Sequence, residues 1–326
     1  DVYKRQASFS FSAMDAATMG NGNQGHIKSY LLLSSEVKGY IRHPEYYFES
    51  DDSTHRKAAD LLMMTQGWRR YDWKLMTYQK DFGKEIQPIT KGDFDYISPV
   101  GTDLQKGWVY FIASPDNFTQ RYLYRAKAFG NGEVERVSPM EQSGQHRYNM
   151  SPTGKWAIHT YSNASTPSVI DMVSFPKHQS VRMLEDNAQA KDQYAALGLN
   201  PKEFIKVKSG NLTLDAWMIK PVDFDASKKY PVIIEVYGEP ASATVQDVWG
   251  NGDLWQQYMA NQGYIVVSIE NRGANTPRGR EWRKCIYGEV GTFSSEDQSR
   301  GILDMARQYP FIDASRIGIT GWSGGG

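Results

Sequence analysis

The last ten residues of the chain, Ile317-Gly318-Ile319-Thr320-Gly321-Trp322-Ser323-Gly324-Gly325-Gly326, decide the fold more than any other stretch. They predict a short apolar strand that runs into Gly-x-Ser-x-Gly, a pattern typical of a nucleophilic serine on a tight strand-to-helix turn. Gly321 and Gly325 lack the Cβ atoms that would clash where the backbone reverses, and the N–H of Gly324 can then point toward a negatively charged oxygen. Because a flexible glycine tail would contain the same five residues, the upstream sequence must decide between these interpretations.

Composition excludes some classes of function. The 326 residues suggest about two domains, and 37 Lys and Arg balance 37 Asp and Glu. Bulk charge therefore does not favour a nucleic-acid or membrane-surface partner. No apolar run of about 18 residues predicts a membrane span. Cys285 is the only cysteine, so no internal disulfide is expected, and its side chain is predicted to be small and buried.

Residues 1–73 carry no catalytic pattern. Residues 7–25 predict a loop or disorder, residues 30–37 a short strand or helical turn, and Ser53–Trp68 a helix capped by Ser53 or Thr54. The histidines of this segment are not spaced as metal ligands, so neither a metal nor a cofactor is expected; they are His26, His43 and His55. The start of the chain has no initiator Met and predicts an incomplete end.

Part of this segment resembles a different kind of protein. The stretch from Lys38 to Tyr71 is similar to large outer-membrane-associated proteins with carboxypeptidase-regulatory-like and plug domains. This resemblance predicts that residues 1–73 are unrelated to the rest, in a chimera joined near Trp73.

Residues 74–202 alternate short strands with turn signals such as Ser151-Pro152-Thr153-Gly154-Lys155. Strands are predicted at Trp108–Ala113, Arg121–Ala126, Trp156–Tyr161 and Ser168–Val173. This spacing suggests a sandwich, barrel or propeller, and the weak repeat of ~40–50 residues favours the C-terminal blades of a propeller. About two to three blades fit. His146, His159 and His178 lie here, and His159 is expected to be a packed strand residue.

Residues 203–326 show a different periodicity. A hairpin is predicted around Ser209-Gly210-Asn211, followed by buried strands at Pro231–Tyr237 and Tyr264–Ile269. Helices are predicted at Asp253–Gln262 and Ser294–Tyr309, the second capped by Ser294 or Ser295. The alternation of strands and helices predicts the first half of a doubly wound, mostly parallel sheet.

Seven groups of residues carry a specific resemblance. They are Leu184-Glu185-Asp186-Asn187, Lys228-Lys229-Tyr230-Pro231, Val236-Tyr237-Gly238-Glu239-Pro240, Asn271-Arg272-Gly273, Gly279-Arg280-Glu281-Trp282, Gly291-Thr292-Phe293 with Glu296-Asp297-Gln298, and Gly321-Trp322-Ser323-Gly324-Gly325. In order and spacing they resemble the prolyl oligopeptidase family, nearest to its dipeptidyl peptidase IV branch. The resemblance implies a β-propeller fragment plus an α/β-hydrolase domain, both incomplete here, in an enzyme that cleaves short peptides, often after proline.

The same resemblance implies residue roles. Ser323 matches the nucleophile, while the Tyr237 hydroxyl and the Gly324 backbone N–H match the oxyanion hole. Glu239 stands where the family often has glycine, and no role is assigned to it. In this fold the triad order is Ser, Asp, His, whereas all six histidines precede Ser323. The base and its carboxylate are therefore expected beyond Gly326, and the chain as given is expected to be catalytically silent.

Three functional interpretations follow. The first is a serine peptidase that removes dipeptides or tripeptides from peptide amino termini through an acyl-enzyme. The second is an esterase or other acyl hydrolase of the same fold. The third takes residues 7–73 as the informative part of a non-enzymatic surface-export protein. The expected partner is a peptide substrate, with no nucleic acid, and the family resemblance implies a homodimer of the complete enzyme and a periplasmic or extracellular location.

Overall fold

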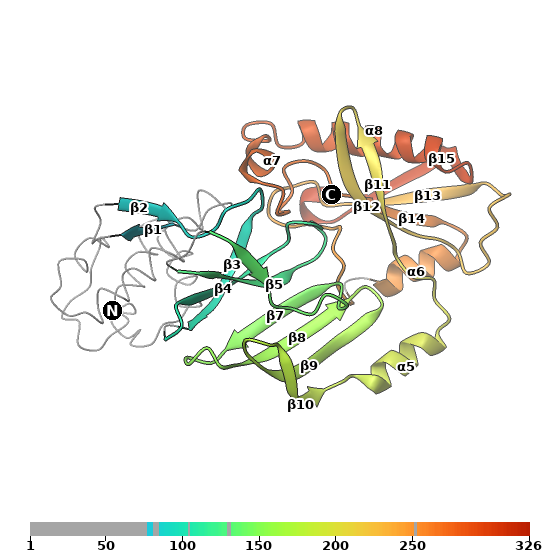
Figure 1. Ribbon diagram of the computed structural model, residues 1–326. Helices are drawn as coiled ribbons and strands as arrows, with labels where there is room; N and C mark the ends of the chain where they lie inside the picture. The colour runs from blue at the N-terminus through green and yellow to red at the C-terminus, as the bar shows by residue number, and fades with distance from the viewer. Residues whose placement is uncertain (1–76, 81–84, 104, 129–131, 251–252) are drawn as a thin grey trace. The chain divides into compact units, whose positions relative to one another are not determined.

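A computed structural model describes residues 77–80, 85–103, 105–128, 132–250 and 253–326 (Figure 1). The described residues fall into two compact units, the first within 77–113, 123–137 and 151–154 and the second within 114–122, 138–150 and 155–326. The elements predicted at 30–37 and 53–68 lie outside the described residues. The domain boundaries predicted after residues 73 and 202 stay predictions.

The first four-stranded sheet follows a short antiparallel pair, β1 (Thr77–Lys80) with β2 (Glu85–Pro88). Its strands lie in chain order and are β3 (Tyr96–Asp103), β4 (Trp108–Ala113), β5 (Tyr122–Lys127) and β6 (Val134–Arg136). The strands predicted at 108–113 and 121–126 are thereby confirmed. Aromatic side chains fill the core of this sheet, where Phe111 packs against Tyr96 and Tyr124.

The second four-stranded sheet is also antiparallel and in chain order. It contains β7 (Gln145–Met150), β8 (Trp156–Asn163), β9 (Thr166–Ser174) and β10 (Gln179–Glu185), drawn in green in Figure 1. Local turns join its strands: Gly154 adopts a φ of 66°, and Asn163 Oδ1 accepts a hydrogen bond from Ser165 N at 3.0 Å. The strands predicted within 156–161 and 168–173 are confirmed. Two such sheets fit two blades of the predicted propeller.

A five-stranded sheet follows the helix α5 (Ala188–Ala196). Its strands are β11 (Glu203–Ser209), β12 (Leu212–Ile219), β13 (Tyr230–Val236), β14 (Ile265–Ile269) and β15 (Ile312–Gly321). They lie in the order β11-β12-β14-β13-β15. β13 is parallel to β14 and β15, but the Gly210 turn makes β11 antiparallel to β12, and β12 is antiparallel to β14. The sheet is therefore mixed, not mostly parallel as predicted.

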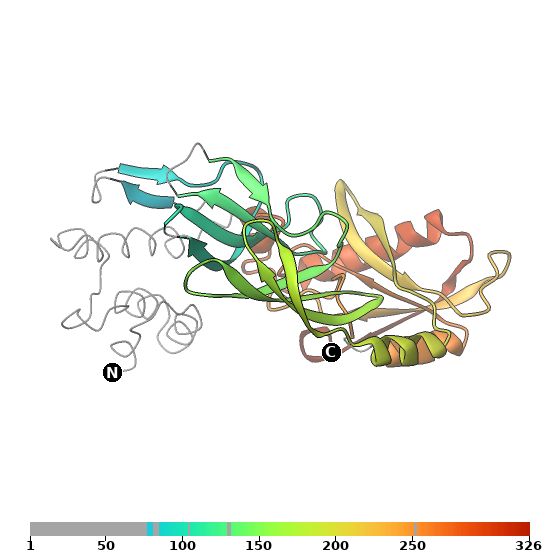
Figure 2. The same cartoon turned by 60° about the horizontal axis from the view of Figure 1, so that its bottom comes forward.

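Helices cover both faces of this sheet: α6 (Asp253–Asn261) and α8 (Thr292–Gln308), with α7 (Arg280–Lys284) between them in the chain. Ile302 and Met305 of α8 pack on Ala216, Met218 and other aliphatic side chains. Trp217 and Ile219, which alternate with those residues on β12, pack instead on Ala260 of α6. α8 and α6 thus lie on opposite faces (Figure 1, Figure 2). Each fully buried aliphatic side chain contributes about 1.5–3 kcal/mol to folding.

Two local predictions are wrong. The helix α8 begins at Thr292, with Gly291 at its N-cap and no side-chain cap; Ser295 Oγ instead donates to the Gly291 carbonyl at 2.6 Å. The positive φ of Gly291 turns the chain into the helix before either predicted cap is reached. Cys285 is exposed rather than buried, because it directly follows the short surface helix α7.

Candidate active site

The carboxyl ends of β13 and β15 meet at one edge of the five-stranded sheet. Because the two strands are parallel and pair Val236 with Gly321, the next residues, Tyr237 and Trp322, leave the sheet side by side. Ser323 then begins a single 3-10 turn, η2 (Ser323–Gly325). The register of these strands therefore brings Tyr237 to the serine turn, although the two lie far apart in the sequence.

The turn itself has the strained geometry that the sequence predicts. Ser323 has a φ of 57°, in the left-handed region that costs a residue with a Cβ about 1–3 kcal/mol. A Cβ on Gly325 would overlap the carbonyl oxygen of Val236, and a Cβ on Gly321 would overlap that of Gly325. Both glycines are therefore required by close backbone approach. Such local strain is typical of functional positions.

The backbone N–H of Gly324 has no hydrogen-bond partner among the described residues. The following N–H groups are used: Gly325 donates to the Trp322 carbonyl at 3.1 Å, and Gly326 donates to the Ser323 carbonyl at 3.0 Å. A free N–H directly after a nucleophilic serine is the donor that an oxyanion needs. Ser323 is exposed, and within the described part of the chain its hydroxyl makes no hydrogen bond.

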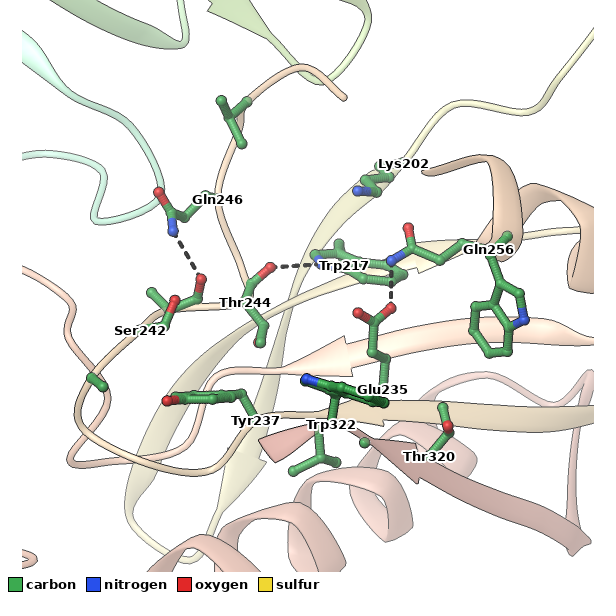
Figure 3. A pocket seen from close by; sticks show the side chains of 16 residues that line it. Lys202, Trp217, Glu235, Tyr237, Ser242, Thr244, Gln246, Gln256, Thr320 and Trp322 are labelled. Carbon is green, nitrogen blue, oxygen red and sulfur yellow. Dashed lines mark hydrogen bonds between the residues drawn. The ribbon is translucent and has the colours of Figure 1, made fainter. Parts of the chain in front are cut away.

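Tyr237 lines a pocket of about 530 Å³ beside this turn (Figure 3). Trp322 lies on the same pocket, and Trp217 forms another of its walls and donates to the Thr244 carbonyl at 3.1 Å. Gln256 donates to the Glu235 carboxylate. The oxygen of the same Gln256 amide is buried and has no hydrogen-bond partner among the residues that the structure describes. The pocket thus combines aromatic walls with polar groups next to Ser323.

Asn271 holds the loop that follows β13, and Asp297 holds the neighbouring residue Arg272. Asn271 donates to the Gly238 carbonyl at 3.2 Å, directly after Tyr237. The Arg272 side chain donates to both carboxylate oxygens of Asp297, at 2.9 and 2.8 Å, and Ser209 donates to the same fully buried Asp297 at 2.6 Å. Such a bidentate, buried pair fixes geometry as well as charge. These residues position the site and lie outside its chemistry.

Sequence reasoning missed the buried carboxylate Glu270. It accepts a hydrogen bond from Val245 N at 2.9 Å and so anchors the pocket loop at Thr244–Val245. Burial raises the pKa of Glu270 to about 7, against the opposing effect of backbone donors at Val245 and Thr244. An acidic residue directly after a fully buried strand is the signal that could have found it.

Of the three described histidines, His146 and His159 lie in the sheet β7–β10 and His178 lies in its β9–β10 turn, all remote in sequence from Ser323. We use the term histidine cluster for His146, Tyr148, His159, Asp171 and His178. Hydrogen bonds join His159 Nδ1 to Asp171 at 2.9 Å, His159 Nε2 to His146 Nδ1 at 2.9 Å, and Tyr148 to His178 at 2.8 Å. Burial lowers the pKa of His159 and lowers that of His178 to about 4. The prediction that His159 is a packed strand residue is confirmed.

No group of three or more His, Cys, Asp or Glu side chains is arranged to hold a metal ion in the part of the chain that the structure describes. Within that part, no helix is long and apolar enough to cross a membrane. The described histidines bond to one another, to Tyr148, to Asp171 and to the Gln142 carbonyl, so none of them serves Ser323.

Two family models match the chain. Residues 5–168 match the dipeptidyl peptidase IV (DPP IV) N-terminal region, and residues 252–326 match the prolyl oligopeptidase family. The chain belongs to the prolyl oligopeptidase family, in its dipeptidyl peptidase IV-like branch. The family resemblance and the propeller fragment expected from the sequence are both confirmed.

Curated relatives and solved structures agree with this membership. A probable dipeptidyl-aminopeptidase B of Emericella nidulans is 32% identical over 241 residues, which cover 73% of this chain and 26% of the relative. Its counterpart in Aspergillus clavatus is 29% identical over 284 residues, covering 84% and 30%. The crystal structure of Porphyromonas gingivalis dipeptidyl peptidase 4 superposes with a TM-score of 0.71 at 33% identity, covering 79% of this chain and 35% of that one. The chain thus spans about a third or less of these proteins.

These matches also bear on residues 1–73. The family match begins at residue 5, and the alignment with the Aspergillus clavatus relative covers 84% of the chain, more than residues 74–326 alone can supply. The matched region therefore extends into the segment that was expected to be unrelated, which argues against a junction near Trp73.

Proposed function

We propose that the complete protein is a serine peptidase that releases dipeptides or tripeptides from peptide amino termini through an acyl-enzyme on Ser323. The observation that carries the proposal is the turn at Ser323, where a strained serine is followed by an unpaired Gly324 N–H. Tyr237 lies beside them at the end of the neighbouring parallel strand. The names of the relatives, dipeptidyl-aminopeptidase B and dipeptidyl peptidase 4, support amino-terminal dipeptide release.

The chemistry follows from these three groups. Attack of Ser323 Oγ on a peptide carbonyl forms a tetrahedral intermediate whose oxygen carries a negative charge. In the proposal, the Gly324 N–H and the Tyr237 hydroxyl donate hydrogen bonds to that oxygen. One such donor is worth about 2.7–4 kcal/mol of transition-state stabilisation.

The proposed fold of residues 203–326 is the amino-terminal half of an α/β-hydrolase domain. Three features support it: a strand order that departs from chain order, helices on both faces, and a serine turn that directly follows a parallel strand. In that fold the orienting carboxylate and the histidine base follow the serine in chain order. We therefore expect the base among the residues that follow Ser323 in the complete protein, and we expect residues 1–326 alone to be inactive.

The proposal is tested with the complete protein and a set of unmodified, amino-terminally acetylated and ester substrates. Mass spectrometry of the products should find amino-terminal dipeptides or tripeptides from the unmodified peptides and much slower cleavage after acetylation. Rapid ester hydrolysis without peptide cleavage would support the alternative, an esterase of the same fold. Cleavage of neither class would contradict the proposal.

A further inference from the structure

The side chain of Glu239 lies against the glycine that follows the serine. If Gly324 had a Cβ, that atom would lie 2.6 Å from Glu239 Cγ and 2.7 Å from Glu239 Oε2, which is closer than real Cβ contacts allow. The Glu239 carboxylate thus occupies the space that a side chain at position 324 would fill. The Glu239 side chain fits at this position because residue 324 is a glycine.

The backbone around Glu239 holds it at this position. Gly238 has a φ of 81°, a conformation that suits glycine, and this turn brings residue 239 back toward the serine. Asn271 fixes the turn through its hydrogen bond to the Gly238 carbonyl at 3.2 Å. Glu239 is half-buried. Among the described residues no hydrogen bond or ion pair engages its carboxylate, although most buried or half-buried carboxylates have such a partner.

A negative charge at this place has a cost during acyl transfer. The N–H of Gly324 is the proposed donor to the oxyanion, so the Glu239 carboxylate lies next to the site where a second negative charge develops. Like charges at short range disfavour one another, and a positive charge between or beside them removes this repulsion. The described chain offers no such cation at Glu239. A bound substrate can supply one.

We propose that Glu239 is a specificity-determining residue that binds the ammonium or guanidinium group of a substrate residue adjacent to the scissile bond. This inference rests on the proposed peptidase function. The cation has two sources, the residue that supplies the scissile carbonyl or the residue that follows it. The chemistry of recognition is the same for both, a carboxylate paired with a cationic side chain.

The test compares matched peptides with the complete protein. Each pair differs only by lysine or norleucine, which removes the ammonium while keeping the aliphatic chain; one pair carries the change before the scissile bond and the other after it. For at least one pair, the parent should favour lysine in kcat/KM by about five- to tenfold, as for a partly exposed ion pair next to a reacting group. Glu239→Gln should bring that ratio to within twofold of unity while retaining turnover of the norleucine peptide.

Two further variants test whether the effect depends on the Glu239 carboxylate and on its position. Glu289→Gln removes one negative charge from an exposed glutamate in the loop before α8 and should leave the ratio unchanged. Gly324→Ala should displace the Glu239 carboxylate and lower the ratio as well. Equal ratios in the parent and in Glu239→Gln would overturn the proposal, and so would a Glu239→Gln variant that loses turnover of both peptides equally.

A binding measurement distinguishes failure of this inference from failure of the proposed function. Calorimetry of the same peptide pairs with Ser323→Ala, and with the double variant Ser323→Ala/Glu239→Gln, reports charge recognition without turnover. Tighter binding of the lysine peptide that is lost in the double variant supports the role of Glu239 even if the parent cleaves nothing. Peptide cleavage without any effect of Glu239 on rate or binding would leave the peptidase proposal intact and remove this one.

Discussion

The sheet β7–β10 and the sheet β11–β15 bury different kinds of side chain. On the first, the interior holds stacked polar rings, with His159 lying 4.7 Å from Tyr148 and 5.2 Å from His146 between ring centroids. On the second, the interior is mostly aliphatic, and the residues of the candidate site lie where β13 and β15 end. The first sheet therefore depends on uncharged histidines, while the second can place charge and strain at one edge.

Topology explains why the candidate site lies on the second sheet. The strands of β7–β10 follow chain order and are joined by tight turns, so their ends offer only hairpin loops. In the other sheet, crossovers place the ends of β13 and β15 side by side, although 84 residues lie between Val236 and Gly321 in the sequence. Residues from distant segments can then meet at a single edge. The following predictions test this contrast, and all use the complete protein.

The largest effect is expected from Tyr237→Phe. Removing the hydroxyl removes one proposed oxyanion donor, so kcat should fall about 100–1,000-fold with little change in stability. Steady-state kinetics on a peptide from which an amino-terminal dipeptide is released measures the fall in kcat. Tyr148→Phe, which removes a hydroxyl from the other sheet, should leave kcat within about threefold, and a similarly small effect of Tyr237→Phe would refute its role.

Asp297→Asn should strongly destabilise the part of the protein built on the five-stranded sheet β11–β15. The substitution removes a buried charge that pairs with Arg272 and accepts from Ser209, so we expect a loss of about 3–5 kcal/mol in the free energy of unfolding. Denaturant unfolding gives the value. As a control, Glu135→Gln breaks the more exposed pair with Arg125 and should cost less than about 1 kcal/mol. Equal costs for the two substitutions would contradict this account of Asp297.

Glu270→Gln should change how stability depends on pH between 4.5 and about 7. Burial raises the pKa of Glu270 from 4.5 to about 7, so the folded protein keeps its proton in a range where the unfolded chain has lost it. The parent should therefore lose up to about 3 kcal/mol as pH rises from 4.5 to 7. Because the amide cannot titrate, the stability of the variant relative to the parent should rise across this window and then stay level. If stability changes with pH equally in the parent and the variant, the Glu270 carboxylate is not the cause of the parent's loss of stability.

His178→Asn should change stability on the acid side instead. Burial lowers the pKa of His178 from 6.5 to about 4, so the unfolded chain takes up a proton before the folded protein does. The parent should lose stability as pH falls from 6.5 to 4, by about 2 kcal/mol from this group after allowing for its partial exposure. Asparagine tolerates the φ of 51° at this position and cannot titrate. Thermal unfolding at several pH values should show that the variant loses less stability than the parent as pH falls from 6.5 to 4. An equal loss in both proteins would contradict a lowered pKa of His178.

Most of the regular elements were predictable because their signals are local. The strand β4, the hairpin around Gly210 and the turn at Ser323 each depend on residues within a few positions of one another. Apolar runs and glycines at turns carry that information directly. The same holds for Ser323 and Gly324, because both belong to one short motif.

What could not be predicted depends on pairing between distant segments. The antiparallel pairing of β12 with β14, which adds to the antiparallel β11–β12 hairpin, is encoded by no local pattern. The position of Glu239 over Gly324 depends on the register of β13 against β15. The histidine cluster requires three strands to be aligned before its members meet. Placing Tyr237 beside the serine from sequence needed the family resemblance.

The central claim, a nucleophilic hydroxyl at position 323, has a direct test. The complete protein is incubated with a fluorophosphonate probe, digested and analysed by mass spectrometry, with Ser299→Ala as a control for an exposed serine on α8. We expect one covalent adduct, on Ser323, that is retained in Ser299→Ala, lost in Ser323→Ala and slowed in Tyr237→Phe. A folded complete protein that forms no adduct at Ser323 would contradict the account.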